Sequence, residues 1–131
     1  MITAFYAAIL ALIFLALTYH VILGRFGKRI AFGAGGDDNM LKRVRAHGNF
    51  AEFVPFALLL LMFAEMQNAP IWSIHAGGIL LVAGRLFHAW GIMHPRIPNA
   101  QRVLGVMLTH IVILGAALWC LWIALVRFTI G

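Results

Sequence analysis

Acidic residues and cysteine are both scarce in this sequence. Only 4 of its 131 residues are Asp or Glu, against 10 Lys or Arg, and charged residues make up 11% of the chain. An ordinary soluble domain carries about 25% charged residues. This composition argues against a soluble enzyme, a disordered chain and a nucleic-acid-binding domain. The single cysteine, Cys120, cannot form a disulfide within the chain, and we expect it to be a small packing residue.

Apolar residues are abundant and are gathered into four long runs. They make up 63% of the chain, where an ordinary soluble domain has about 45–50%. The runs cover residues 2–23, 50–66, 71–93 and 103–128. A helix of about 20 apolar residues crosses a bilayer core, and backbone groups in lipid must be paired within their own segment. We therefore predict an all-α fold, a four-helix transmembrane bundle that forms one domain over residues 1–131.

The second and fourth helices carry recognisable start signals. The second is predicted to begin near Met40, with Asp37, Asp38 or Asn39 as its N-cap. Asn99 is the expected N-cap of the fourth helix. A chain of this length encloses little volume between its helices, so a sizeable ligand site is expected to need neighbouring copies and a homo-oligomer.

Basic residues are unequally distributed over the connections between the runs. Eight lie in or beside the first and third connections: Arg25, Lys28, Arg29, Lys42, Arg43, Arg45, Arg96 and Arg102. The second connection, residues 67–70, has none. The positive-inside rule therefore predicts that the first and third connections are cytoplasmic and that both termini lie outside. Part of this basic cluster is also expected to lie against anionic lipid headgroups.

Charged and polar residues within the spans indicate a structural or functional role, because a charge at the centre of a span costs about 2.5–3.5 kcal/mol on insertion scales. Arg45, Asn49 and Glu52 follow one another at intervals of four and three residues, so they share one helix face. Arg85 and His88 share a face of the third helix. All five are expected near the cytoplasmic end.

Arg25 ends the first run and Arg102 begins the fourth, so all four helices bring polar groups to one membrane depth. One interpretation is a set of isolated salt bridges in which Arg45 or Arg85 neutralises Glu52. The surplus of guanidinium groups over carboxylates favours a second interpretation, a site for a ligand that carries carboxylates. An arginine in the first turn of the fourth helix would also favour a bound thiolate over a thiol, because the helix N-terminus attracts anions.

The segment from Arg43 to Pro55 resembles the second-helix signature of the MAPEG family, the membrane-associated proteins in eicosanoid and glutathione metabolism. The five residues that match the signature at its spacing are Arg45, Ala46, Asn49, Glu52 and Pro55. Residues 21–25 are similar to the end of the family's first helix. Residues 85–88 are similar to the third helix of its prostaglandin E synthase branch. The chain most resembles a bacterial-type member.

The resemblance implies a homotrimer that binds glutathione between neighbouring subunits near the cytoplasmic face, in a bacterial inner membrane. It implies that glutathione is held by six side chains: Arg25, Arg45, Asn49, Glu52, Arg85 and His88. It also implies a catalytic role for Arg102, which would stabilise the glutathione thiolate. Membrane lipids and a lipophilic molecule from the bilayer are the other implied partners, and neither a metal nor a nucleic acid is expected.

Three positions depart from the family pattern. Gly48 stands where some members have a further arginine, Ile92 where glutathione-binding members have a tyrosine, and Val103 where the prostaglandin branch has a serine. These departures weaken the case for eicosanoid synthesis. The predicted function is a glutathione transferase or a lipid hydroperoxide peroxidase, and the alternative is a lipid-binding protein of the same fold without catalysis. A four-span cation exporter is disfavoured because the first span has no acidic residue.

Two further expectations concern packing. Gly77, Gly78 and Gly84 are expected to allow close helix contacts. Glu65 lies near the outer end of the second span, where we expect it to be solvated.

Overall fold

The computed structural model describes residues 1–95 and 99–130 and consists of four long helices. They are α1 (Ile2–Lys28), α2 (Asp38–Met66), α3 (Ile71–Met93) and α4 (Ala100–Ile130). Each is long and apolar enough to cross a membrane, so the predicted four-helix transmembrane bundle is confirmed. Arg96, which we counted among the basic residues of the third connection, lies outside the described residues.

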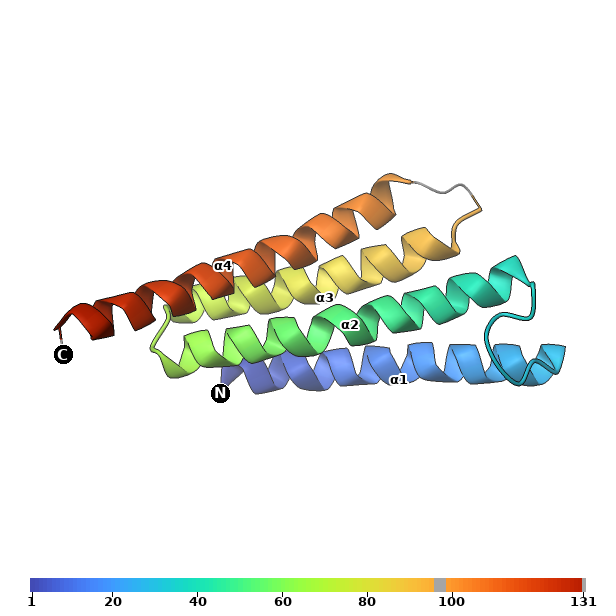
Figure 1. The fold of residues 1–131 in the computed structure, drawn as a ribbon, viewed down its shortest axis with the longest axis horizontal. Helices are drawn as coiled ribbons and strands as arrows, with labels where there is room; N and C mark the ends of the chain where they lie inside the picture. The colour runs from blue at the N-terminus through green and yellow to red at the C-terminus, as the bar shows by residue number, and fades with distance from the viewer. Residues whose placement is uncertain (96–98, 131) are drawn as a thin grey trace.

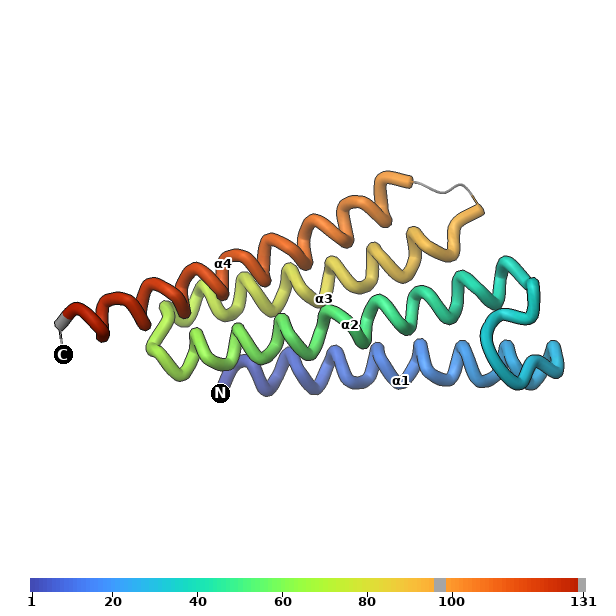
Figure 2. The backbone as a smooth tube through the Cα atoms, viewed as in Figure 1, coloured from blue at the N-terminus to red at the C-terminus, as the bar shows by residue number. Residues whose placement is uncertain are grey.

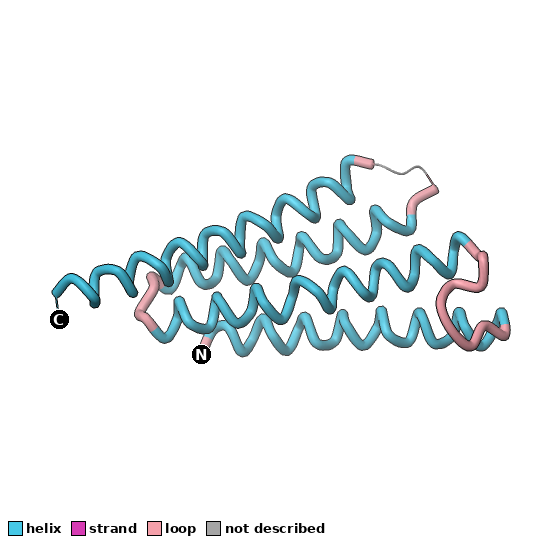
Figure 3. Tube along the Cα trace, in the orientation of Figure 1, coloured by secondary structure: helices cyan, strands magenta, loops and turns pink. Residues whose placement is uncertain are grey.

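The helices run side by side, and the bundle has two distinct ends (Figure 1). The α1–α2 connection, the end of α3 and the start of α4 lie at one end, called the loop end below. The short α2–α3 turn and the N-terminus lie at the opposite end, called the turn end, and α4 extends past this turn (Figure 2). Helix accounts for nearly all of the described chain, with loops confined to the connections (Figure 3).

The two inner helices, α2 and α3, hold the bundle together. These two helices contact each other, and each of them also contacts α1 and α4. Within the described chain, α1 and α4 do not contact each other. The core is built from large aliphatic and aromatic side chains of all four helices, among them Leu10, Phe50, Leu81 and Val112. The outer faces of α1 and α4 expose further apolar side chains, such as Leu12 and Leu118, as expected of surfaces that face lipid or another subunit.

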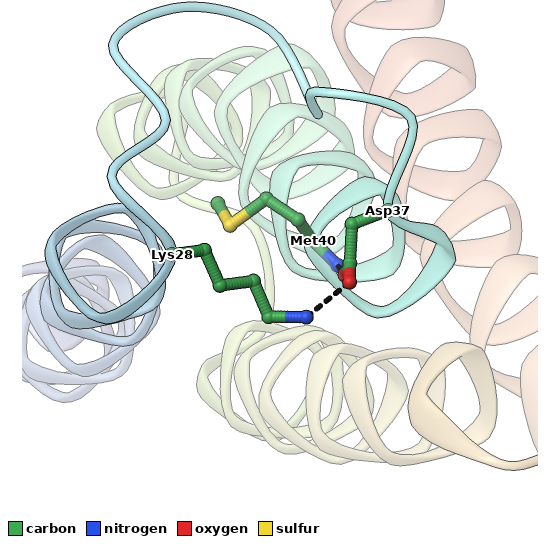
Figure 4. Close-up of polar contacts among 3 residues, drawn as sticks. All are labelled: Lys28, Asp37 and Met40. Carbon is green, nitrogen blue, oxygen red and sulfur yellow. Dashed lines mark hydrogen bonds and ion pairs between the residues drawn. The ribbon is translucent and has the colours of Figure 1, made fainter.

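The connection between α1 and α2 is fixed by the predicted cap of α2. Asp37 is the N-cap residue, and its Oδ1 accepts a hydrogen bond from the N–H of Met40 at 2.7 Å. Its Oδ2 forms an ion pair with the ammonium group of Lys28 at the end of α1 (Figure 4). The Lys28 ammonium and the N–H of Met40 hold the pKa of the Asp37 carboxyl below its usual value. Helix α2 therefore begins two residues before Met40.

Glu65, expected to be solvated, is partly exposed and also has backbone partners that the sequence did not reveal. Its carboxylate accepts hydrogen bonds from the backbone N–H groups of Ile2 and Thr3, the latter at 2.9 Å. The first N–H groups of a helix have no partner within the helix, and a carboxylate is favoured there by the helix dipole. Glu65 of α2 thus caps the N-terminus of α1 and ties the two helices together at the turn end.

Candidate anion-binding site

A hollow of about 380 Å³ opens at the loop end between α2 and the junction of α3 with α4. Lys42 and Arg45 of α2 line one side, and Arg102 of α4 lines another. Asp38 is the one carboxylate among its described lining residues. Three cations against one carboxylate leave a net positive charge, and such a hollow attracts anions.

The N-terminus of α4 is held against the end of α3 by a double contact through Asn99. The Oδ1 atom of Asn99 accepts a hydrogen bond from the N–H of Arg102 at 2.9 Å, and its Nδ2 donates to the carbonyl of Gly91 at 2.7 Å. A Cβ atom on Gly91 would lie 2.8 Å from the Cα of Arg102, so only glycine permits this approach. The predicted cap at Asn99 is confirmed, and Arg102 lies in the first turn of α4.

Arg85 and His88 form a buried polar layer in α3, with exposed fractions of 2% and 3%. The guanidinium group of Arg85 donates through Nη1 to Oδ1 of Asn49 at 2.8 Å and through Nη2 to the carbonyl of Gly105 at 3.3 Å. Its Nε atom is buried and has no hydrogen-bond partner within the described chain. The structure therefore brings Asn49 of α2 and Arg85 of α3 into direct contact.

His88 belongs to the buried layer and does not line the cationic hollow. It lies within electrostatic range of the guanidinium groups of Arg85, Arg102 and Arg45. Four predicted residues therefore lie around one region: Arg45, Arg85, His88 and Arg102. Asn49 is next to this region because it is hydrogen-bonded to Arg85.

Glu52 takes no part in an ion pair with Arg45 or Arg85, so the interpretation as isolated salt bridges is wrong for these residues. Its side chain is exposed, and the pair between Lys28 and Asp37 is the one ion pair found within residues 1–95 and 99–130. The surplus of guanidinium groups at this end is not neutralised by Glu52.

Arg25 lies in a different place from Arg45 and Arg102. It lines an open hollow of about 500 Å³ together with apolar side chains of α1 and the following loop, such as Phe26 and Ile30. Its Nη1 donates to the carbonyl of Ala31 at 3.1 Å. Within a single chain, the structure therefore places Arg25 at the same end of the bundle but outside the hollow of Arg45 and Arg102.

Two lining residues of the hollow were missed as site candidates in the sequence. Lys42 was counted only as a topology signal, yet it lines the hollow and its Nζ donates to the carbonyl of His94 at 3.3 Å. Asp38 was considered only as a cap. The spacing of these residues could have indicated the hollow in the sequence. Asp38, Lys42 and Arg45 are spaced by four and three residues and so share a helix face. Ile92, singled out for its departure from the family pattern, is 5% exposed and also lines the hollow.

The chain is similar to known proteins. The model of the MAPEG family matches residues 3–122. The chain is 39% identical over 94 residues to the inner membrane protein YecN from two strains of Escherichia coli, and the aligned part covers 72% of this chain and 72% of each relative. No solved structure matches the chain.

Proposed function

Because the chain belongs to the MAPEG family, we propose that this membrane protein binds glutathione in the hollow at the loop end and uses it in catalysis. The observation that carries the proposal is the joint lining of this hollow by Arg45 and Arg102 from two helices, with Lys42 beside them. Glutathione has two carboxylates and one ammonium group, so its thiolate form needs a cationic surrounding. The similarity to YecN supports a location in the bacterial inner membrane. The basic residues of the connections favour an orientation with the loop end in the cytoplasm.

The proposed binding mode places the tripeptide in the hollow at the loop end, next to the buried polar layer. Arg45 and Lys42 attract the carboxylates. Arg85 and His88 are buried and do not line the hollow, but Arg85 adds positive charge behind it. Arg85 also keeps a buried Nε without a partner among the described residues. Such a donor is costly to leave unpaired.

The remaining two residues of the family pattern call for a second copy of the chain. Arg25 lines a separate hollow and Glu52 is exposed on α2, so neither reaches the cationic hollow within one subunit. The apolar faces of α1 and α4 are also uncovered. A homotrimer would bring Arg25 and Glu52 to the sites of neighbouring subunits, and native mass spectrometry of the purified membrane protein would measure the number of subunits.

The proposed reaction starts from the glutathione thiolate, held by Arg102 and the N-terminus of α4. Both favour the charged sulfur. In conjugation, the sulfur forms a bond to an electrophilic carbon of a lipophile, and the leaving group departs with the bonding electrons. In peroxide reduction, the sulfur takes one oxygen of a lipid hydroperoxide, the alcohol is released, and a second glutathione converts the sulfenic acid into a disulfide and water. Holding both reactants together supplies much of the rate.

The test of catalysis compares the wild type with Arg102→Ala, Arg102→Lys and the distant control Arg127→Ala in the purified protein. Conjugation of a chlorinated dinitrobenzene and reduction of a lipid hydroperoxide are measured at saturating glutathione. We expect Arg102→Ala to lower kcat by about 100-fold, the usual loss for one electrostatic stabiliser, with partial retention in Arg102→Lys. Equal turnover in Arg102→Ala and in the wild type would contradict the proposed role of Arg102.

The buried position of Ile92 favours one competing function, a lipid-binding protein without thiol chemistry. Ile92 lines the hollow, and the resemblance to the family implies a tyrosine at this position in glutathione-binding members, so this chain lacks that hydroxyl group. This alternative predicts no saturable binding of glutathione at all, and therefore differs from the first proposal in a binding measurement as well as in turnover.

A further inference from the structure

Asp38 contributes a carboxylate to the otherwise cationic hollow at the loop end. It is the first residue of α2, and its side chain is exposed. Its neighbour Asp37 uses its own carboxylate to cap Met40 and to pair with Lys28. Asp38 forms no ion pair within the described chain, not even with Lys42 one helical turn away. A carboxylate in a hollow that attracts anions repels a purely anionic ligand, so its presence favours a ligand that also carries a positive charge.

The charges of the hollow match those of the ligand proposed above one for one. Lys42, Arg45 and Arg102 carry three positive charges, and Asp38 carries one negative charge. The thiolate form of glutathione carries three negative charges, on two carboxylates and the sulfur, and one positive charge on the ammonium group of its γ-glutamyl residue. The volume of the hollow, about 380 Å³, lies within the range of about 300–1,000 Å³ that is typical of ligand sites. Each charged group of the tripeptide can therefore meet a group of opposite charge.

The spacing of the charged residues along α2 suits the two ends of an extended tripeptide. Asp38 and Lys42 are four residues apart, so their side chains are neighbours on one helix face. An α-amino acid group has an ammonium and a carboxylate on one carbon atom, and two adjacent side chains of opposite charge can bind both. Arg45 lies seven residues from Asp38, or about 10 Å along the helix axis, and three extended residues also span about 10 Å. The γ-glutamyl end then lies at Asp38 and Lys42 and the glycine carboxylate at Arg45, which leaves Arg102 for the sulfur.

We propose that Asp38 binds the ammonium group of the γ-glutamyl residue, so that the hollow selects ligands with a free amino group beside a carboxylate. This inference rests on the proposed binding of glutathione and names the residue that distinguishes it from other anions. Glu52, which the family resemblance implies as a glutathione ligand, is not among the described lining residues of the hollow in its own chain, whereas Asp38 is. Recognition of the ammonium group therefore comes from the same subunit as Lys42 and Arg45.

The test is a thermodynamic cycle between Asp38 and the amino group of the ligand. Isothermal titration calorimetry measures the affinity of the purified protein in nanodiscs for glutathione and for its des-amino analogue, glutaryl-cysteinylglycine. The wild type should bind glutathione about 10- to 100-fold more tightly than the analogue, the value of a hydrogen bond to a charged group. Asp38→Asn should weaken the binding of glutathione by a similar factor. It should not weaken the binding of the analogue, because it removes a charge that repels an anionic ligand.

Three further variants separate this role from other effects. Asp38→Glu keeps the charge and should retain most of the preference for glutathione. Asn39→Ala, outside the described lining of the hollow, is the matched control and should keep both affinities. Glu52→Gln tests the rival carboxylate, and the preference for glutathione over the analogue should persist in it. A negative charge in the first turn of α2 also suits the helix dipole, but the loss of that role alone would weaken both ligands alike.

Three outcomes would overturn the inference while glutathione still binds. The first is equal affinity of the wild type for both ligands, and the second is an unchanged preference in Asp38→Asn. The third is a preference that is lost in Glu52→Gln and kept in Asp38→Asn. Absence of saturable binding of either ligand by the wild type would instead contradict the proposed function, and this inference with it.

Discussion

Arg85 illustrates what single residues contribute to this site and how much of it was predictable. A guanidinium group within a predicted span indicated a polar site, and Asn49 and Arg85 were both selected as candidates. The direct hydrogen bond between them, at 2.8 Å, was not predictable, because it depends on how α2 and α3 are rotated about their axes. The exposure of the Glu52 side chain could not be predicted from the sequence for the same reason.

The bond between Asn49 and Arg85 should contribute measurably to stability. Asn49→Ala removes the acceptor and leaves a second buried N–H group of Arg85 unpaired, which should lower the free energy of unfolding by about 1.5–3 kcal/mol. Asn39→Ala, on the exposed start of the same helix, is the matched control and should change it by less than about 0.5 kcal/mol. Unfolding in mixed detergent without glutathione measures both, and equal stability of the two variants would contradict this role of Asn49.

Asp37 should make the stability of the loop end depend on pH in a defined direction. Its pKa is lowered in the folded protein by Lys28 and by the N–H of Met40. The stabilisation is therefore present above the pKa of the unfolded chain, near 3.8, and is lost as the pH falls through the lower folded value. Asp37→Asn should melt below the wild type at neutral pH, and the difference should shrink towards pH 3. Thermal unfolding across this range measures it, and a difference that stays the same down to pH 3 would contradict this role of Asp37.

At the scale of the helices, the sequence predicted more than at the scale of side chains. The bounds of α3 agree with the predicted run, and the caps at Asp37 and Asn99 are as expected. Run lengths and capping residues are local signals, which explains this success. The prediction missed the last turn of α1, since Arg25 and Lys28 interrupt the apolar run there while still favouring a helix C-terminus.

Close contacts of α3 with the other three helices were partly foreseen through glycine. Gly77 and Gly78 lie under Leu61 and Tyr6, and Gly84 lies against the carbonyl of Gly105, all at close range. The participation of Gly91 and Gly105 was missed, because a glycine in a helix does not reveal which neighbour it faces.

Gly105 should therefore tolerate no side chain. A Cβ atom there would lie 2.5 Å from the carbonyl oxygen of Gly84 and 2.5 Å from the N–H nitrogen of His88, and backbone atoms cannot move aside. Gly105→Ala should lower the free energy of unfolding by about 1–3 kcal/mol. Gly115→Ala on the same helix has open space and should gain up to about 1 kcal/mol, because alanine favours the helix. Denaturation of both variants in mixed detergent measures their free energies of unfolding. An unchanged free energy of unfolding in Gly105→Ala would contradict the close contact.

At the scale of the whole molecule, one chain assembles only part of the predicted site. Lys42, Arg45 and Arg102 share one hollow, whereas Arg25 lines another and Glu52 is exposed. Sequence arguments placed Arg25, Arg45, Glu52 and Arg102 at one membrane depth but carried no information on their direction around the bundle. The uncovered apolar faces of α1 and α4 are consistent with neighbouring subunits that would complete the site.

The most direct test of this account is the affinity of the purified protein for glutathione, measured by isothermal titration calorimetry in detergent or nanodiscs. The account predicts saturable binding by the wild type and by the control Arg127→Ala at the opposite end of α4. It predicts that Arg45→Ala weakens binding about 10- to 100-fold, the value of a hydrogen bond to a charged group. Absence of saturable binding in the wild type, or an unchanged affinity in Arg45→Ala, would contradict the claim that the cationic hollow at the loop end holds glutathione.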